Sequence, residues 1–219
     1  MLKLNATLAQ AADNIASGIK ETGKYVGVIT RAEKLVSKDK GTQGLGLSFK
    51  ADNGQTADYL DIYHTKGDGE PLSGLKTVNA ILCCTKTVEA ADGPIKIEKW
   101  DAKAGARVPT TVSGYPALMG KRVGFLLQKT LETGNDGKDR DRVQIFAVFN
   151  AETELTASEM YAKKTSPERL GNMLDALMAR PVRDNRKTTK ARPKSSGFDD
   201  SGADRFDDMP PAGDDDAPF

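Results

Sequence analysis

The strongest structural signal in this chain is LGLSFKADNGQTADYLDIY, residues 45–63. Apolar and polar residues alternate on both sides of Asn53-Gly54, as in two half-buried strands joined by a tight turn. Asn-Gly is favoured in such turns because both central residues of a type I′ turn take a positive φ. We therefore predict an antiparallel hairpin.

Further strand and helix patterns lie on both sides of this hairpin. A long β-rich segment, 25–36, precedes it, and Ser73 can cap a helix over 73–82 that follows it. The remaining predicted elements are weak strands at 95–100 and 108–113, firm strands at 121–132 and 142–150, and a helix that starts at Pro167 and ends before Pro181.

The order of these elements is three strands, a helix, and then two or more strands. This order fits a small Greek-key barrel of the OB type, in which a helix lies between the third and fourth strands. We therefore predict a mainly β protein, with an OB-like Greek-key barrel, a helix after the third strand, a C-terminal helix and a disordered acidic tail. A generic α+β sheet is the alternative.

Charge is segregated along the 219 residues, although the net charge is only +1. Residues 1–180 hold 25 basic and 22 acidic side chains, 181–197 hold six basic and one acidic, and 198–219 hold eight aspartates and one arginine. This pattern indicates a polyanion partner with an internal competitor. The predicted parts are an N-terminal segment with helical spacing (1–22), a binding domain (23–180), a basic disordered linker (181–197) and an acidic disordered tail (198–219).

Composition also limits the cellular setting. The two cysteines, Cys83 and Cys84, are adjacent, so a bond between them would close no useful loop, and we expect free thiols in a reducing cytoplasm. No apolar run approaches the roughly 20 residues of a membrane span. The first residues lack the layout of a secretion signal. We expect a soluble cytoplasmic protein.

Catalytic patterns are weak. His64 is the single histidine, and with two adjacent cysteines it does not give the separated ligand pairs of a zinc site. The pairs Asp58/Asp61 and Asp139/Asp141 are the best acidic candidates for a metal-dependent nuclease, which stays a remote alternative. We predict no enzyme activity, no cofactor and no metal.

Binding of nucleic acid fits the sequence better. Single strands are held by aromatic rings that stack on bases and by basic side chains along the backbone. Strand alternation places Tyr59, Asp61 and Tyr63 opposite Leu60 and Ile62, so the two tyrosines face outward if the aliphatic residues face the core.

Two further rings are stacking candidates. Phe146 shares strand parity with Arg142 and Gln144, and Trp100 lies between Lys99 and Lys103. A place in the core for Phe146, a role in fixing the connection for Trp100, and simple cover of a sheet face for the tyrosines are the alternatives.

Basic residues near these strands are candidates for contact with phosphate, and an ordinary solvated surface is the alternative. The candidates are Arg31, Lys34, Lys50, Lys121, Arg122 and Arg142. By contrast, Phe49 and Phe125 share parity with aliphatic neighbours, so we place both in the core.

The C-terminus carries a specific similarity. Asp214-Asp215-Asp216-Ala217-Pro218-Phe219 resembles the Asp-Asp-Asp-Ile-Pro-Phe ending of bacterial single-stranded DNA-binding proteins, with Ala217 at the Ile place. Phage proteins of this role also carry acidic tails that end in Phe. The resemblance implies recruitment of replication, recombination or repair proteins through Asp214, Asp215, Asp216, Pro218 and Phe219.

The body also resembles an uncharacterised phage family found among recombination and replication genes. The similar stretch runs from Tyr25 through Gly74-Leu75-Lys76-Thr77-Val78-Asn79-Ala80 to Gly120-Lys121-Arg122-Val123. We predict a phage single-stranded DNA-binding protein that coats and protects single strands in the host cytoplasm. An RNA-binding OB protein and a strand-annealing accessory protein are the alternatives, and self-association is left open.

Overall fold

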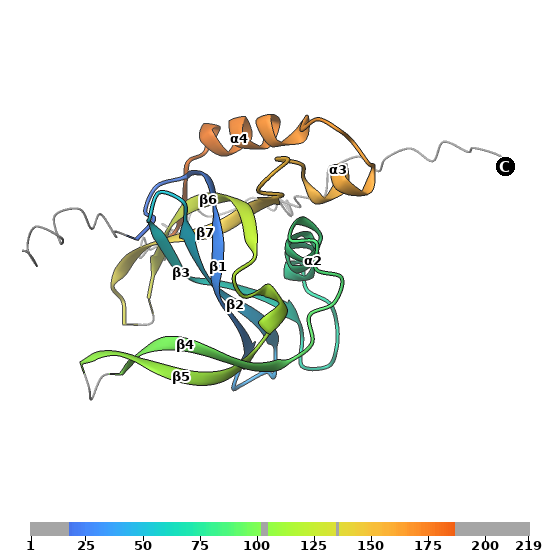
Figure 1. Ribbon diagram of the computed structural model, residues 1–219. Coiled ribbons are helices and arrows are strands. Elements are labelled where there is room, and N and C mark those ends of the chain that lie inside the picture. Colours follow the sequence, from blue (N-terminus) through green and yellow to red (C-terminus); the bar gives the residue numbers. More distant parts are fainter. Residues whose placement is uncertain (1–17, 102–104, 135, 187–219) are drawn as a thin grey trace, which may run out of the picture. The chain divides into compact units, whose positions relative to one another are not determined.

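The computed structural model describes residues 18–101, 105–134 and 136–186, without the side chains of Trp100 and Asp101 (Figure 1). The described chain is mainly β. The strands are β1 (Gly23–Val36), β2 (Gln43–Ala51), β3 (Thr56–Thr65), β4 (Gly93–Asp101), β5 (Ala106–Gly114), β6 (Arg122–Thr133), β7 (Asp139–Phe149) and β8 (Val182–Asn185). The helices are α2 (Gly74–Cys84), the short 3-10 helix η1 (Pro116–Leu118), α3 (Ala157–Tyr161) and α4 (Arg169–Ala179).

The longest strand, β1, belongs to both halves of the sheet. Its second half pairs with β2, and its first half pairs with β6, both antiparallel. Gly27 lies where the two pairings overlap, and a Cβ there would lie 2.1 Å from the carbonyl oxygen of Lys50. Only glycine tolerates so close an approach of β2, which lets the sheet turn around its core.

The main core lies inside this bent sheet. Phe49 of β2 and Phe125 of β6 are both fully buried, and their rings meet edge to face with centroids 5.1 Å apart. Ile81 and Cys84 of α2 belong to the same cluster, so α2 covers one end of the core. The prediction that both phenylalanines are core residues is confirmed.

The sheet stays open. Its pairing runs β3-β2-β1-β5-β4, with β6 beside β1 and with β7 and β8 beside β6. Within the described residues no backbone pairing joins β3 to β7, so the sheet is not closed into a barrel. The predicted mainly β fold, the helix after the third strand and the C-terminal helix are confirmed, in an open, mainly antiparallel sheet. The hairpin at residues 45–63 is also confirmed, but its turn differs from a two-residue type I′ turn. Lys50 lies opposite Thr56 and the Ala51 N–H donates to the Gln55 carbonyl oxygen, so the turn has three residues, 52–54, of which only Gly54 has a positive φ.

The two weak strand signals form one long hairpin, β4–β5. All nine residues of each strand pair with the other strand. One pairing, Glu33 with Gly114, joins this hairpin to β1. Figure 1 shows the hairpin extending from the base of the sheet as a separate arm. We call β4 and β5 the arm.

A second, smaller core lies on the outer face of β6 and β7. Leu126 and Phe149 from the strands pack there against Leu170 and Leu177 of α4. Figure 1 shows α4 lying across this side of the sheet. None of the helices in the described ranges is long and apolar enough to cross a membrane.

A buried carboxylate fixes the start of α4. Glu159 of α3 is 2% exposed, and its Oε1 accepts the backbone N–H groups of Glu168 and Arg169, both at 2.8 Å. Its Oε2 accepts the N–H and the hydroxyl of Thr156, also at 2.8 Å. The helix therefore begins at Arg169 rather than at Pro167, because Glu159 satisfies the first amides there.

This carboxylate makes stability depend on pH. Burial opposes ionisation of Glu159, but the hydrogen bonds from Thr156, Arg169 and Glu168 outweigh it and lower the pKa from 4.5 to about 2. A lowered pKa in the folded state stabilises the fold above the unfolded pKa, and this contribution is lost as the pH falls from about 4.5 towards 2.

Glu159→Gln is expected to lower the free energy of unfolding by about 2–4 kcal/mol at neutral pH, because a neutral amide cannot accept four donors as a carboxylate does. Urea denaturation of both proteins at pH 7 and at pH 3 measures the effect. The difference between the two proteins should narrow at the lower pH. A difference that stays constant with pH would contradict this role.

The structured part extends beyond residue 180, where we ended the predicted domain. β8 lies parallel to β6, with Val182 opposite Lys129. The preceding turn is tied to the start of β1, since the Thr22 hydroxyl donates to the carbonyl oxygen of Pro181 and accepts the N–H of Lys129. The first residues of the predicted basic linker therefore form a strand, because β6 has a free edge beyond its pairing with β1.

Candidate nucleic-acid interface

Two strands bulge on either side of Ser48 in β2. In β1, Thr30 is an extra residue between the pairs made by Ile29 and Arg31. In β3, Asp58 and Tyr59 together lie opposite Ser48. Bulges bend a strand and change the direction of the side chains beside them. Here they bring Arg31 and Tyr59, from different strands, to the same point of the exposed sheet face.

Tyr59 has an unusual backbone conformation. Its φ is +59°, in the left-handed region, which bulky residues rarely adopt and which costs on the order of 1–3 kcal/mol. The side chain is 63% exposed. The guanidinium carbon of Arg31 lies 5.8 Å from the ring centre, within range of a cation–π contact. The sheet therefore holds a solvent-facing ring at an energetic cost, which is typical of functional positions.

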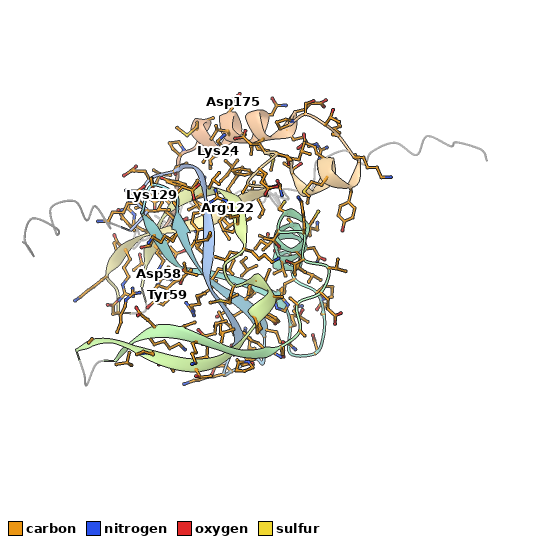
Figure 2. The ribbon with its side chains drawn as sticks, in the orientation of Figure 1. Lys24, Asp58, Tyr59, Arg122, Lys129 and Asp175 are labelled. Carbon is orange, nitrogen blue, oxygen red and sulfur yellow. The ribbon has the colours of Figure 1, made fainter. Side chains whose placement is uncertain are left out.

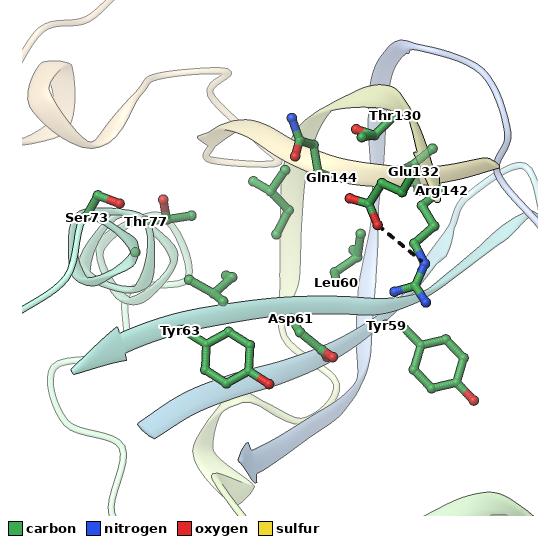
Figure 3. A pocket seen from close by; sticks show the side chains of 14 residues that line it. Tyr59, Leu60, Asp61, Tyr63, Ser73, Thr77, Thr130, Glu132, Arg142 and Gln144 are labelled. Carbon is green, nitrogen blue, oxygen red and sulfur yellow. Dashed lines mark ion pairs between the residues drawn. The ribbon is translucent and has the colours of Figure 1, made fainter. Parts of the chain in front are cut away.

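Asp61 and Tyr63 share the exposed side of β3 with Tyr59 (Figure 3). Tyr63 is 46% exposed, and its ring covers Gly44 of β2, where a Cβ would lie 3.0 Å from the ring. Leu60, which lies between Tyr59 and Asp61 in the sequence, is only 2% exposed. The predicted alternation of this strand is confirmed, and both tyrosines present ring surface to solvent.

A groove of about 510 Å³ lies between the unpaired edges of β3 and β7. Tyr59, Asp61 and Tyr63 line it from β3, and Arg142 and Gln144 line it from β7 (Figure 3). The first turn of α2 closes one end. This volume lies in the range of small-molecule sites, about 300–1,000 Å³, and suits a nucleobase with its sugar.

The wall of the groove contains an unsatisfied hydroxyl. Thr130 of β6 is fully buried and lines the groove, and its Oγ1 has no hydrogen-bond partner in the described chain. Buried polar atoms are nearly always paired, so this hydroxyl is an exception among the described residues. Gln144 offers a second polar group, although its amide already donates to Gln128 Oε1 at 3.2 Å.

A smaller groove lies on the other side of Tyr59, between β3 and the arm. Its volume is about 230 Å³, and Arg31, Tyr59, Lys99 and Arg107 are among its lining residues. Because Tyr59 lines both grooves, its ring stands at the boundary between them. The two grooves together form one surface, which we call the β3 groove.

Ion pairs hold the arm beside this surface. Glu33 is 8% exposed and accepts hydrogen bonds from Lys99 at 2.7 Å and from Arg31 at 2.8 Å. Burial opposes ionisation of Glu33, but these two bonds outweigh it and hold its pKa below the ordinary value. Arg107 of β5 pairs with Asp58 of β3 at 3.2 Å. Lys99 and Arg107 of the arm therefore already have carboxylate partners, whereas Lys96 has none among the described residues.

The predicted phosphate contacts are not brought together. Arg31 and Arg142 line the β3 groove, where Arg142 lies 3.9 Å from Glu132. Arg122 forms a bidentate pair with Asp52, at 2.7 and 3.1 Å, outside this groove. Lys34 pairs with Asp92. Lys50 and Lys121 are exposed, and neither has an ion-pair partner among the described residues.

Of the two other predicted stacking residues, Phe146 does not join the tyrosines. Phe146 is 43% exposed but does not line the β3 groove, because it is the extra residue of a bulge in β7 between the pairs of Ile145 and Ala147. Beyond this bulge the parity of β7 is reversed, and Ala147 packs under α4. The side chain of Trp100 lies outside the described residues.

Lys99 and Arg107 are groove residues that the sequence did not indicate. Their strands give weak signals. Lys99 is held by Glu33 of β1 across 66 residues, and Arg107 by Asp58 of β3 across 49 residues. The residues of the predicted tail, Asp214, Asp215, Asp216, Pro218 and Phe219, lie outside the described ranges, as do residues 1–17.

The sequence matches no protein-family model and no curated protein. Within the described ranges no three His, Cys, Asp or Glu side chains are grouped as a metal site would require.

Proposed function

We propose that the chain is a single-stranded DNA-binding protein that holds strands in the β3 groove with little dependence on sequence at most positions. The observation that carries this proposal is the pair of exposed rings, Tyr59 and Tyr63, on one side of a strand between two grooves. Rings that face solvent along a groove with cations at its rim are the elements that stack bases and guide a phosphate backbone.

The strand order supports an OB-like reading of the fold. If the arm is taken as an insertion, the order is three strands, α2, and two further strands, β6 and β7, with β1 next to β6. This is the order of the five-stranded Greek-key barrel, whose second and third strands commonly bind oligonucleotides. The groove between β3 and β7 then lies at the seam of an incompletely closed barrel.

The internal ion pairs set the energetic balance. A phosphate that binds Arg107 or Lys99 must replace a carboxylate, so these contacts contribute less than those of free cations. We therefore infer that stacking supplies most of the affinity, with ion pairing from Arg142 as a smaller contribution. Burial of the rings by bases also explains why the sheet maintains a strained Tyr59.

The acidic segment at 198–219 adds a second part to the proposal, which rests on the sequence alone. Its ending resembles that of bacterial single-stranded DNA-binding proteins, and we propose that it recruits proteins of replication, recombination or repair in a host cytoplasm. Its eight aspartates also make it a competitor for the basic side chains of the domain.

A salt titration of binding tests the central proposal. The full chain should bind an unstructured dT oligomer at least about tenfold more tightly than a duplex of equal length, since a duplex cannot offer its bases to the tyrosines and each stack is worth about 1–3 kcal/mol. Fluorescence anisotropy with labelled oligomers measures both affinities. Equal affinity for the two, or none for either, would contradict the proposal.

The same titration separates a groove cation from a distant one. Each phosphate contact on a single strand contributes about −0.7 to the slope of log K against log salt. Arg142→Ala should therefore make the slope shallower by about 0.7. Arg122→Ala is the matched control, because its guanidinium is held by Asp52 outside the groove, and it should leave the slope unchanged.

A further inference from the structure

Asp61 is an acid in the middle of a surface that we assign to a polyanion. It lies on the exposed side of β3, between the two tyrosines, and lines the groove (Figure 3). No hydrogen bond or ion pair joins its carboxylate to another residue of the described chain. Of the other acids that line the groove, Asp58 and Glu132 each have a basic partner, and Glu98, at the arm, has none among the described residues. The oxygens of Asp61 are thus free to accept hydrogen bonds from a ligand.

The position of Asp61 suits contact with a base. Residues two apart on a strand point to the same side and lie about 6.6 Å apart. A base stacked on Tyr63 or Tyr59 would therefore bring one of its edges towards the carboxylate. The phosphates of the same strand would lie towards the rim of the groove, where Arg142 stands.

We propose that Asp61 reads the Watson–Crick edge of a base stacked on the neighbouring tyrosines and selects guanine at that position. This inference rests on the proposed function and adds a base preference to it. Guanine presents two adjacent donors, N1–H and the N2 amino group, which match the two oxygens of a carboxylate.

The other bases fit less well. Thymine presents a single N3–H between two carbonyl oxygens, and these repel a carboxylate. Cytosine and adenine each place a ring-nitrogen acceptor beside their amino group. A bidentate contact distinguishes bases by about 5- to 150-fold in affinity. One position of the site is therefore selective, while the other contacts tolerate any base.

The charged groups near Asp61 allow its carboxylate to accept hydrogen bonds beside a bound polyanion. Burial raises the pKa of Asp61, and the positive charges of Arg31 and Arg142 partly offset this rise. Those two arginines also reduce the repulsion between Asp61 and a bound phosphate backbone. The acid is thus compatible with a polyanion, at the cost of weaker binding to bases that do not hydrogen-bond with it.

The experiment compares the affinity of the full chain for oligo-dT with its affinity for the same oligomer carrying isolated guanines, which avoids guanine quadruplexes. The guanine oligomer should bind about 5- to 150-fold more tightly, and Asp61→Asn should remove most of this difference. Inosine, which lacks the N2 amino group, should give an intermediate affinity.

A modified base identifies the edge that is read. 7-Deazaguanine keeps the N1 and N2 donors but lacks N7, the atom that arginine contacts in guanine. It should bind as guanine does. If it loses the preference, an arginine reads the base and the proposal for Asp61 is wrong.

Asp175→Asn is the control for loss of a negative charge. Asp175 is exposed on α4, on the other side of the sheet from Tyr59 (Figure 2), and this variant should keep the guanine preference. Equal affinity of the unmodified protein for both oligomers, or a preference that survives in Asp61→Asn, would overturn the inference and leave the proposed function standing. Absence of binding to any single strand would overturn both.

Discussion

The double variant Tyr59→Gly/Tyr63→Ala is expected to bind oligo-dT at least about thirtyfold more weakly than the unmodified protein. Each base stack on an aromatic ring contributes about 1–3 kcal/mol, so the loss of two stacks removes at least about 2 kcal/mol. Anisotropy titration at one fixed salt concentration measures the change.

Glycine is chosen at position 59 because of the backbone. With φ at +59°, Tyr59 is strained, and glycine adopts this conformation without cost. Tyr59→Gly should therefore be as stable as the unmodified protein, and more stable than Tyr59→Ala by about 1 kcal/mol. Thermal unfolding of the two single variants checks this, and it separates loss of binding from loss of folding.

Tyr161→Ala provides the matched control for the double variant. Tyr161 is 81% exposed on α3 and does not line the β3 groove. Its removal should leave affinity for oligo-dT unchanged. If the double variant bound as tightly as this control, the tyrosines of β3 would not be the stacking platform.

Phe125→Ala is expected to lower the free energy of unfolding by about 3–5 kcal/mol, the usual cost of removing a fully buried aromatic ring. Phe125 is completely buried, and its ring packs against Phe49, so truncation leaves a cavity between β2 and β6. These strands belong to the two halves of the bent sheet. Urea denaturation followed by circular dichroism measures the loss.

Two variants complete this measurement. Phe125→Leu keeps most of the side-chain volume and should be clearly less destabilising. If Phe125→Ala does not fold, Phe125→Leu still allows the contribution of this position to be measured. Val88→Ala changes a fully exposed side chain and should shift the free energy of unfolding by less than about 0.5 kcal/mol. If Phe125→Ala lowered the free energy of unfolding as little as Val88→Ala does, the assignment of Phe125 to the core would be wrong.

The alternating pattern of β3 made its exposed face predictable. Leu60 alternates with Tyr59 and Tyr63, and burial of one face follows from this period. The buried positions of Phe49 and Phe125 followed in the same way. Local sequence was sufficient here because side-chain direction in a regular strand depends only on parity.

Bulges limited the prediction elsewhere. The extra residues Thr30 and Phe146 have no marked local signature, yet each reverses the parity of the strand beyond it. The bulge at Tyr59 is equally hidden, because a tyrosine gives no sign of a positive φ. Parity arguments therefore hold only between bulges.

Ion pairs between residues far apart in the sequence were the other feature that could not be predicted. Candidate phosphate contacts were chosen by charge and nearness to strands, but charge alone does not show which cations have carboxylate partners. Arg122 meets Asp52 across 70 residues, and Arg107 meets Asp58 across 49. Such partners are set by the folded sheet, so Lys50 and Arg122 looked equivalent in sequence although their surroundings differ.

The attachment of the arm has a consequence for motion. A single backbone pairing, Glu33 with Gly114, joins the arm to β1. Its other attachments are the bond from Lys99 to the buried Glu33, the buried side chains of Ile95 and Ile97, and the exposed pair of Arg107 with Asp58, which adds little resistance to opening. The arm can therefore unfold locally, as a unit of its own, far more often than the whole chain unfolds. Its amide hydrogens should exchange early, while those of β1 and β6 exchange late. Since Lys99 and Arg107 move with it, local opening widens one side of the groove and leaves the rings of β3 in place.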